Sequence, residues 1–171
     1  MNIHKKIIEK KHRLSRNEYK GFIRVAFVCC LKNKDLLFCN STIKETTLEC
    51  IKEAAAYTDI DVTLYVIMPD HLHLIVKGRS EKADAYKFVK GLKYNLTKRL
   101  KKNILQKDFF DHIIKNHFDL AKQIIYIIEN PVRKKFVNNW REYDGIGSLT
   151  GSVENIIDFS VGILNDNKNL M

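Results

Sequence analysis

Cysteine, proline and glycine are scarce in this chain, which has four, two and seven of them among 171 residues. The cysteines, Cys29, Cys30, Cys39 and Cys50, all lie in the first third, and two of them are adjacent. This spacing fits neither a disulfide framework nor paired C-x-x-C zinc motifs, so we expect reduced thiols. The shortage of proline and glycine leaves no stretch that resembles a linker. We therefore expect residues 1–171 to form a single domain that begins with a basic arm at 1–20.

A long apolar segment is also absent from the sequence. No apolar run approaches the roughly 18 residues that a membrane-spanning helix needs. The N-terminus, MNIHKKIIEKKHRLSR, is basic but lacks the apolar stretch of a signal peptide. We therefore expect a cytoplasmic protein without a membrane partner.

Acidic residues are outnumbered by basic ones. The chain has 30 Lys and Arg against 20 Asp and Glu, a formal net charge of +10. A basic surface favours a polyanionic partner, because each neutralised phosphate releases counterions. Nucleic acid is the first candidate, although the charge alone fits a basic protein without such a partner equally well.

What the chain does contain is an ordered succession of strand and helix patterns. In order, we expect a strand at 21–31, a helix begun by a capping box at Thr42 and Glu45, a hairpin of strands at 62–68 and 71–77, a helix at 84–102, a strand at 108–114 and a helix from Asp119 to Asn130. Pro131 should end the last helix, because proline disfavours helical geometry in the residue before it. The succession predicts an α+β fold: a ferredoxin-like antiparallel sheet with helices on one side and an added C-terminal helix.

Two histidines lie inside the strand expected at 71–77. Side chains alternate along a strand, so His71 and His73 project from one face while Leu72 and Leu74 project from the other. Two imidazoles on one face can converge on a divalent ion that takes further ligands from elsewhere. The alternative is a pair of hydrogen-bonded histidines on a polar sheet face.

A tyrosine lies on the polar side of the last expected helix. Its buried stripe consists of Leu120, Ile124, Ile127 and Ile128, which sets Tyr126 and Asn130 off that stripe and one helical turn apart. A tyrosine in this position is either a functional group or an ordinary residue at the rim of an amphipathic helix.

The helix expected at 84–102 has a cationic face. At helical spacing, five residues fall together on the side opposite its apolar stripe: Lys87, Lys90, Tyr94, Lys98 and Lys101. Ammonium groups around an aromatic ring suit single-stranded nucleic acid, while plain solvation explains a lysine-rich face equally well.

Two motifs together resemble a known family. MPDHLHLIV, followed some fifty residues later by YIIENPVRKKFV, resembles the HUH single-tyrosine transposases, and most closely their REP-associated branch, which usually reads MPNHVHLL and YI-x-x-NPVRAGLV. RNEYKGFIRV and LQKDFFDHII also fit. The resemblance covers residues 16–148 and leaves 149–171 as a C-terminal tail. Asp70, Leu105 and the pair Lys134-Lys135 depart from the family wording, where Asn, Trp and Ala-Gly are usual.

The resemblance implies an enzyme that cleaves and transfers single-stranded or hairpin DNA through a 5′-phosphotyrosine. It implies that His71 and His73 bind Mg²⁺ or Mn²⁺, that Asn130 assists at the metal, and that the tyrosine of the C-terminal helix, Tyr126, is the nucleophile. Arg133, Lys134 and Lys135 follow that helix closely enough to touch the DNA. Relatives exist as monomers and as homodimers.

Two other functions remain open at this level. A non-catalytic single-stranded nucleic-acid-binding module can use the same fold, although it would have no need of the histidines and the tyrosine together. A metal-dependent phosphoesterase could use His112 or His117 with water in place of the tyrosine; both can equally be ordinary surface residues.

Overall fold

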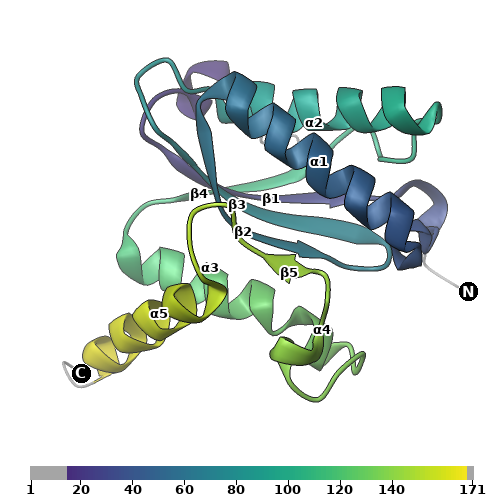
Figure 1. The fold of residues 1–171 in the computed structure, drawn as a ribbon. Coiled ribbons are helices and arrows are strands. Elements are labelled where there is room, and N and C mark those ends of the chain that lie inside the picture. The colour runs from purple at the N-terminus through teal and green to yellow at the C-terminus, as the bar shows by residue number, and fades with distance from the viewer. Residues whose placement is uncertain (1–14, 169–171) are drawn as a thin grey trace, which may run out of the picture.

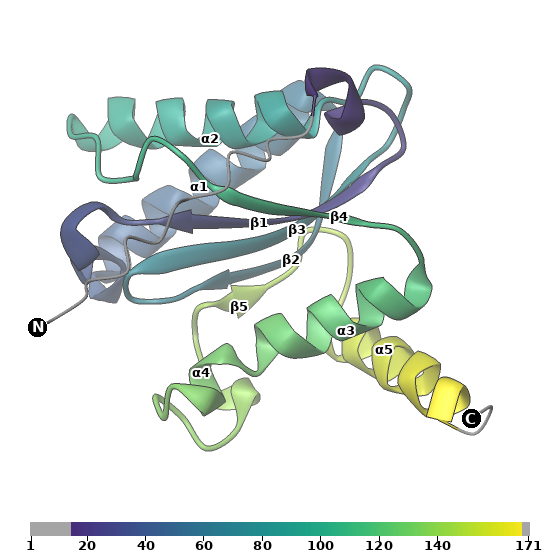
Figure 2. The ribbon, with the colours of Figure 1, turned by 180° about the vertical axis from the view of Figure 1, so that it is seen from behind.

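The computed structural model describes residues 15–168, which form an antiparallel sheet with helices on both faces (Figures 1 and 2). The strands are β1 (Arg24–Cys30), β2 (Ile60–Ile67), β3 (His71–Gly78), β4 (Phe110–Ile114) and β5 (Ile146–Gly147), in the spatial order β4-β1-β3-β2-β5. The helices α1 (Ser41–Thr58) and α2 (Ala85–Leu100) lie above the sheet in Figure 1, and α3 (His117–Ile128), α4 (Asn130–Arg133) and α5 (Val153–Lys168) lie below it. The predicted α+β fold and its succession of elements are confirmed. The tail helix α5 and the short strand β5 were not predicted.

Each face of the sheet has its own core. On one side Leu72, Leu74 and Val76 of β3 join the apolar residues of α1 and α2. On the other, Ile75 of β3 packs with Leu120 and the remaining apolar stripe of α3. Burial of each large side chain contributes on the order of 1.5–3 kcal/mol, so the two cores hold the sheet firmly between its helices. Because β3 is central, its side chains on the α3 side are held in a fixed frame.

Two predicted helix starts are wrong. α1 begins after Asn40, whose side chain accepts a hydrogen bond from the backbone of Ile43, so Thr42 lies inside the helix and forms no capping box with Glu45. α3 begins after Asn116, whose side chain caps the backbone N–H of Asp119 at 2.8 Å. In both places an asparagine supplies the cap, because its short amide reaches the free N–H groups of the first turn.

Pro131 does not end the helical path. α3 stops at Ile128, Glu129 keeps a helical backbone, and α4 continues to Arg133. Proline has no N–H to offer the carbonyl of Ile127, four residues earlier. The side-chain amide of Asn130 donates to that carbonyl instead, at 3.2 Å. The helix is therefore interrupted and repaired by the residue that precedes the proline.

Other expectations about the chain are met only in part. All four cysteines are free thiols, as expected. Within residues 15–168, no helix is both long enough and apolar enough to cross a membrane. Most of the arm expected at 1–20 lies outside the described residues; its end, Arg16–Tyr19, forms a 3-10 helix, and the hydroxyl of Tyr19 donates to Asp111 at 2.8 Å.

Candidate active site

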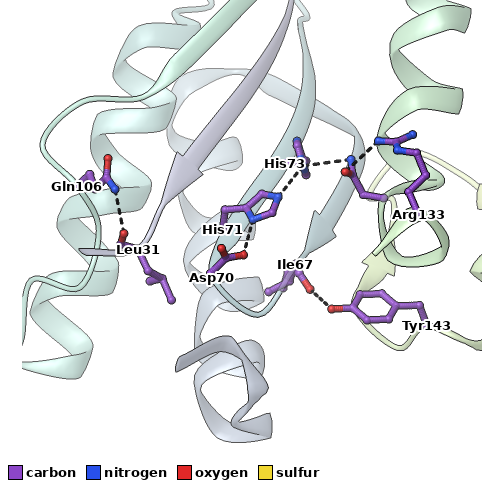
Figure 3. Close-up of polar contacts among 9 residues, drawn as sticks. Leu31, Ile67, Asp70, His71, His73, Gln106, Arg133 and Tyr143 are labelled. Atoms are coloured by element: carbon purple, nitrogen blue, oxygen red, sulfur yellow. Dashed lines mark hydrogen bonds and ion pairs between the residues drawn. The ribbon is translucent and has the colours of Figure 1, made fainter. Parts of the chain in front are cut away.

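Two histidines converge at the start of β3, on the sheet face that α3 covers. The Nε2 atoms of His71 and His73 lie 2.9 Å apart, and the rings meet edge to face with centroids 4.6 Å apart (Figure 3). Nδ1 of His71 lies 2.6 Å from a carboxylate oxygen of Asp70, in the turn before the strand. This contact fixes the His71 ring so that its other nitrogen faces His73. The alternation predicted for the two histidines is confirmed by the register of β3.

His73 is the buried member of the pair. Burial, and to a smaller extent the charges of His71 and Arg133, lowers its pKa to about 3, while Asp70 acts in the opposite direction. The ring is therefore neutral at ordinary pH, which is the form that can ligate a metal. Within residues 15–168, its Nδ1 is buried and has no hydrogen-bond partner, whereas a ligating histidine usually donates its other ring N–H to one.

The histidine nitrogens fit a shared divalent ion. Two nitrogens bound to one ion at about 2.1 Å, at about a right angle, lie about 3 Å apart. The separation of 2.9 Å between the two Nε2 atoms matches this arrangement. Among the described residues, no group of three or more His, Cys, Asp or Glu side chains is placed to hold a metal ion.

Asn130 reaches the histidine pair, but with the nitrogen of its amide. The residue is only 6% exposed, and its Nδ2 lies 3.2 Å from Nε2 of His73. The same nitrogen donates to the carbonyls of Tyr126 and Ile127, and Oδ1 accepts from Arg133 at 3.0 Å. Each amide atom thus has a suitable partner. A role as a metal ligand through Oδ1 requires the side chain to rotate away from Arg133.

Tyr126 lies beside the same hollow as His73. The apolar stripe of α3 turns the tyrosine away from the core, and 58% of its surface is exposed. Tyr126 and His73 both line a hollow of about 120 Å³, together with Phe110 and His112 of β4. The structure therefore brings together the tyrosine, the histidine pair and Asn130, which are separated by some fifty residues in the sequence.

Arg133 connects the tyrosine with the amide. Its guanidinium lies over the Tyr126 ring, 4.2 Å from the centroid, and donates to Oδ1 of Asn130. The sequence interpretation assigned Arg133 only to the DNA. Its spacing of seven residues from Tyr126 and three from Asn130 is the signal that could have revealed both contacts, because residues at these spacings share a helix face.

A second imidazole lines the hollow. Nε2 of His112 lies 2.9 Å and 3.0 Å from the two carboxylate oxygens of Asp119. This carboxylate also accepts a hydrogen bond from the backbone N–H of Lys115. Burial works against ionisation of Asp119, but the hydrogen bonds from Lys115 and His112 and the charges of His112 and Lys122 outweigh it and lower the pKa. His117 instead packs its ring against Phe159 of α5, so only one of the two histidines suggested for a phosphoesterase lies beside the tyrosine.

The two groups of predicted DNA-binding residues lie in different places. Lys134 and Lys135 are exposed directly after α4, next to Arg133. The cationic face of α2 is exposed as predicted, but it belongs to the helix layer on the other side of the sheet from Tyr126 (Figure 1). Its members are Lys87, Lys90, Tyr94, Lys98 and Lys101. The structure does not bring this face to the histidine pair.

Comparison with known proteins gives consistent matches. A provisionally named REP-associated tyrosine transposase of Haemophilus influenzae is 28% identical over 102 residues, which cover 50% of this chain and 57% of that protein. The match thus spans less than two thirds of the relative. The structure of a REP-associated tyrosine transposase bound to a REP hairpin superposes with a TM-score of 0.69 over 75% of this chain and 78% of that one. At 23% identity this likeness shows a shared fold.

A family model gives the assignment. The model described as "Transposase IS200 like" matches residues 21–118, which include the histidine pair and end before Tyr126. This match covers more than half of the 171 residues. The chain belongs to the IS200-like transposase family.

Proposed function

We propose that this chain cleaves one DNA strand and rejoins it elsewhere through a 5′-phosphotyrosine at Tyr126, as in DNA transposition. One observation carries the proposal: the exposed Tyr126 and the buried His73 line a single hollow, and His71 directs its Nε2 to the same place. An exposed phenol can act as the nucleophile of a covalent phosphoryl transfer, and a pair of convergent imidazoles can hold the metal ion that assists it.

The proposed reaction is an exchange of phosphodiester bonds. The phenol oxygen of Tyr126 attacks the phosphorus and loses its proton, and the bond from phosphorus to the 3′-oxygen breaks. The 3′-oxygen leaves with the electron pair and takes up a proton as a 3′-hydroxyl, while the 5′-phosphate remains on the tyrosine. Attack by another 3′-hydroxyl reverses these changes and releases the phenol. Because the phosphodiester bond is exchanged for another phosphoester, joining needs no external energy source.

The residues around Tyr126 have separate tasks in this proposal. Arg133 orients the phenol ring by lying over its face and presents a cation to the phosphate. Asp70 holds the His71 ring, and burial keeps the His73 ring neutral. We propose that His71, His73 and, after rotation of its amide, Asn130 hold Mg²⁺ or Mn²⁺. When bound, the ion would polarise the scissile phosphate and offset the charge that grows on its oxygens.

The proposed substrate is single-stranded or hairpin DNA. The REP-associated transposase of similar fold was solved with a REP hairpin, and this chain carries a formal net charge of +10. Lys134 and Lys135 are exposed directly after Arg133, whose guanidinium covers the Tyr126 ring, so we propose that they neutralise phosphates close to the cleavage point.

The test is a search for the covalent product. The full chain is incubated with end-labelled hairpin DNA and Mn²⁺, and the mixture is separated by denaturing electrophoresis. We expect a protein–DNA adduct that disappears in Tyr126→Phe and in the presence of a chelator, while Tyr126→Phe still binds the DNA. An adduct that persists in Tyr126→Phe contradicts the role of Tyr126. Tight binding without any adduct would instead identify a nucleic-acid-binding module.

A further inference from the structure

Phe136 is an exposed aromatic ring in a backbone that is held in place. Its side chain is 52% exposed, and it lies three residues after Arg133, the last residue of α4. The backbone N–H of Phe136 donates to the carbonyl of Pro131, and that of Lys135 to the carbonyl of Val132, both at 2.9 Å. These two bonds close the end of the helix in a Schellman motif. The ring is thus presented to solvent from a fixed position.

The inner side of this ring is backed by a second aromatic residue. Tyr143 lies almost parallel to Phe136, with 21° between the planes and 6.5 Å between the centroids. The hydroxyl of Tyr143 donates to the carbonyl of Ile67 at 2.9 Å (Figure 3). Burial and the nearby carboxylates Asp144 and Asp70, together with Cys39, raise the pKa of this phenol to about 12, so the hydroxyl keeps its proton. The two rings form a stack whose inner end is anchored to β2.

This stack lies beside the candidate active site. Ile67 is the last residue of β2, and only the turn at 68–70 separates it from His71. On the other side, Arg133 lies three residues before Phe136 and covers the Tyr126 ring. Both aromatic residues are therefore connected through short segments to the groups that would hold and attack the phosphate.

Two exposed cations next to Phe136 suit the backbone of a nucleic-acid strand. Lys134 and Lys135 are exposed next to Phe136, and neither forms an ion pair within the part of the chain that the structure describes. Lys135 has a φ of 61°, in the left-handed region where glycine is favoured. Rings interleaved with cations are the usual means of holding unpaired bases and their phosphates.

We propose that Phe136, backed by Tyr143, is a stacking platform for an unpaired base of the DNA strand next to the scissile phosphate, with Lys134 and Lys135 on its backbone. This inference rests on the proposed function, because it assigns a subsite for the same DNA. The ligand class is an unpaired nucleobase within a strand, since a ring face without hydrogen-bonding groups accepts any base by its π surface.

The experiment compares ring-retaining and ring-removing variants of the full chain. Phe136→Ala and Phe136→Trp are prepared in the Tyr126→Phe background, so that binding is measured without cleavage. The probes are a hairpin with a single-stranded flank that carries 2-aminopurine at one flank position at a time, and the same hairpin without the flank. Tyr57→Ala removes another exposed ring, 89% accessible and located on α1 across the sheet, and serves as the matched control.

We expect the parent and Phe136→Trp to quench 2-aminopurine at one or two flank positions. Phe136→Ala should lose this quenching and bind the flanked hairpin about tenfold more weakly, the usual effect of removing one stacking ring. Its affinity for the flankless hairpin, and that of Tyr57→Ala for both probes, should stay unchanged.

The stacking platform is contradicted if Phe136→Ala leaves both the quenching and the affinity unchanged. It is also contradicted if Phe136→Ala loses as much affinity for the flankless hairpin as for the flanked one, because Phe136 would then contact the duplex. The adduct assay with the unaltered chain keeps the two proposals apart. If an adduct forms but Phe136→Ala changes neither quenching nor affinity, only the stacking platform is contradicted. If quenching depends on the flank but no adduct forms, only the proposed cleavage is contradicted.

Discussion

The guanidinium of Arg133 lies over the ring of Tyr126 at 4.2 Å and at the same time donates to the amide oxygen of Asn130. One side chain thereby fixes the orientation of the exposed phenol relative to the amide that touches His73. Tyr126 is 58% exposed, so its contact with Arg133 matters for the orientation of its ring. The order of this site therefore depends on the planar shape of arginine as well as on its charge.

Replacement of Arg133 should slow adduct formation more than it weakens DNA binding. We expect Arg133→Ala to lower the single-turnover rate at saturating DNA by roughly tenfold, because the phenol is no longer held at the attacking position. Arg133→Lys keeps the charge but loses the planar stacking and should recover the affinity without recovering the rate. Full recovery of the rate in Arg133→Lys would mean that only the charge matters.

Asn130 should be important for stability as well as for activity. Its buried amide donates to the carbonyls of Tyr126 and Ile127, and the carbonyl of Ile127 lacks the usual helical donor four residues on because Pro131 has no N–H. Removing the amide leaves buried acceptors unsatisfied, which costs about 1–3 kcal/mol. We therefore expect Asn130→Ala to reduce the free energy of unfolding in urea by this amount, and the exposed substitution Asn138→Ala to leave it nearly unchanged. A shift below about 0.5 kcal/mol in Asn130→Ala, within the range of ordinary surface substitutions, would contradict this account.

The sequence was sufficient to place the histidines but not the amide. Strand alternation alone puts His71 and His73 on one face, because the period of two holds along β3. Helical spacing predicted that Asn130 shares the polar face of Tyr126, yet Asn130 is buried. The reason is the interruption at Glu129 and the attraction of the Asn130 amide to a carbonyl freed by Pro131, which are details of local hydrogen bonding that periodicity does not contain.

The positions of the cationic residues show a similar limit. The amphipathic pattern of α2 correctly predicted which side chains are exposed. Whether that exposed face lies near Tyr126 depends on which face of the sheet α2 covers, and a hydrophobic period carries no such information. The pairing of His112 with Asp119 likewise depends on the turn between β4 and α3.

Lys135 offers a test of the cost of its backbone geometry. With a φ of 61° at the end of α4, Lys135→Gly should relieve an unfavourable conformation that costs about 1–2 kcal/mol, partly offset by the greater freedom of glycine in the unfolded chain. We expect a net stabilisation of about 0.5–1 kcal/mol in urea unfolding, accompanied by weaker DNA binding.

The neighbouring residue supplies the control. Lys134 has a φ of −84°, an ordinary value for any residue, so Lys134→Gly loses a cation without relieving strain. Lys134→Gly should therefore bind DNA more weakly without gaining stability. Equal changes in stability for both variants would show that the geometry at Lys135 is not strained.

Charge reversal can separate the two cationic surfaces. We propose that the cationic face of α2 and the pair Lys134-Lys135 both contact DNA. The double variant Lys90→Glu/Lys98→Glu on α2 should lower the affinity for DNA. It should keep the adduct yield at saturating DNA, because α2 lies across the sheet from α3, which carries Tyr126. Lys134→Glu/Lys135→Glu should lower both quantities. Each lost phosphate contact should reduce the slope of log K against log salt by about 0.7 for single-stranded DNA. If the α2 variant shows an unchanged affinity and slope across a salt series, that face is merely solvated.

Asp119 should make stability depend on pH at the acidic end. Its pKa is lowered in the folded state, despite partial burial, by the hydrogen bonds from Lys115 and His112 and by nearby positive charge. A carboxylate with a lowered folded pKa contributes stability above its unfolded pKa of about 3.9, and this contribution is lost as pH falls through the folded value. Asp119→Asn should therefore be less stable than the parent at pH 7, and the difference in the free energy of urea unfolding should shrink steadily below about pH 4.

The matched control is Asp158→Asn on α5. Asp158 forms no ion pair within residues 15–168, so the difference between this variant and the parent should not shrink at low pH. A difference between the parent and Asp119→Asn that stays constant from pH 7 to pH 3 would mean that Asp119 acts through the geometry of its hydrogen bonds and not through its charge.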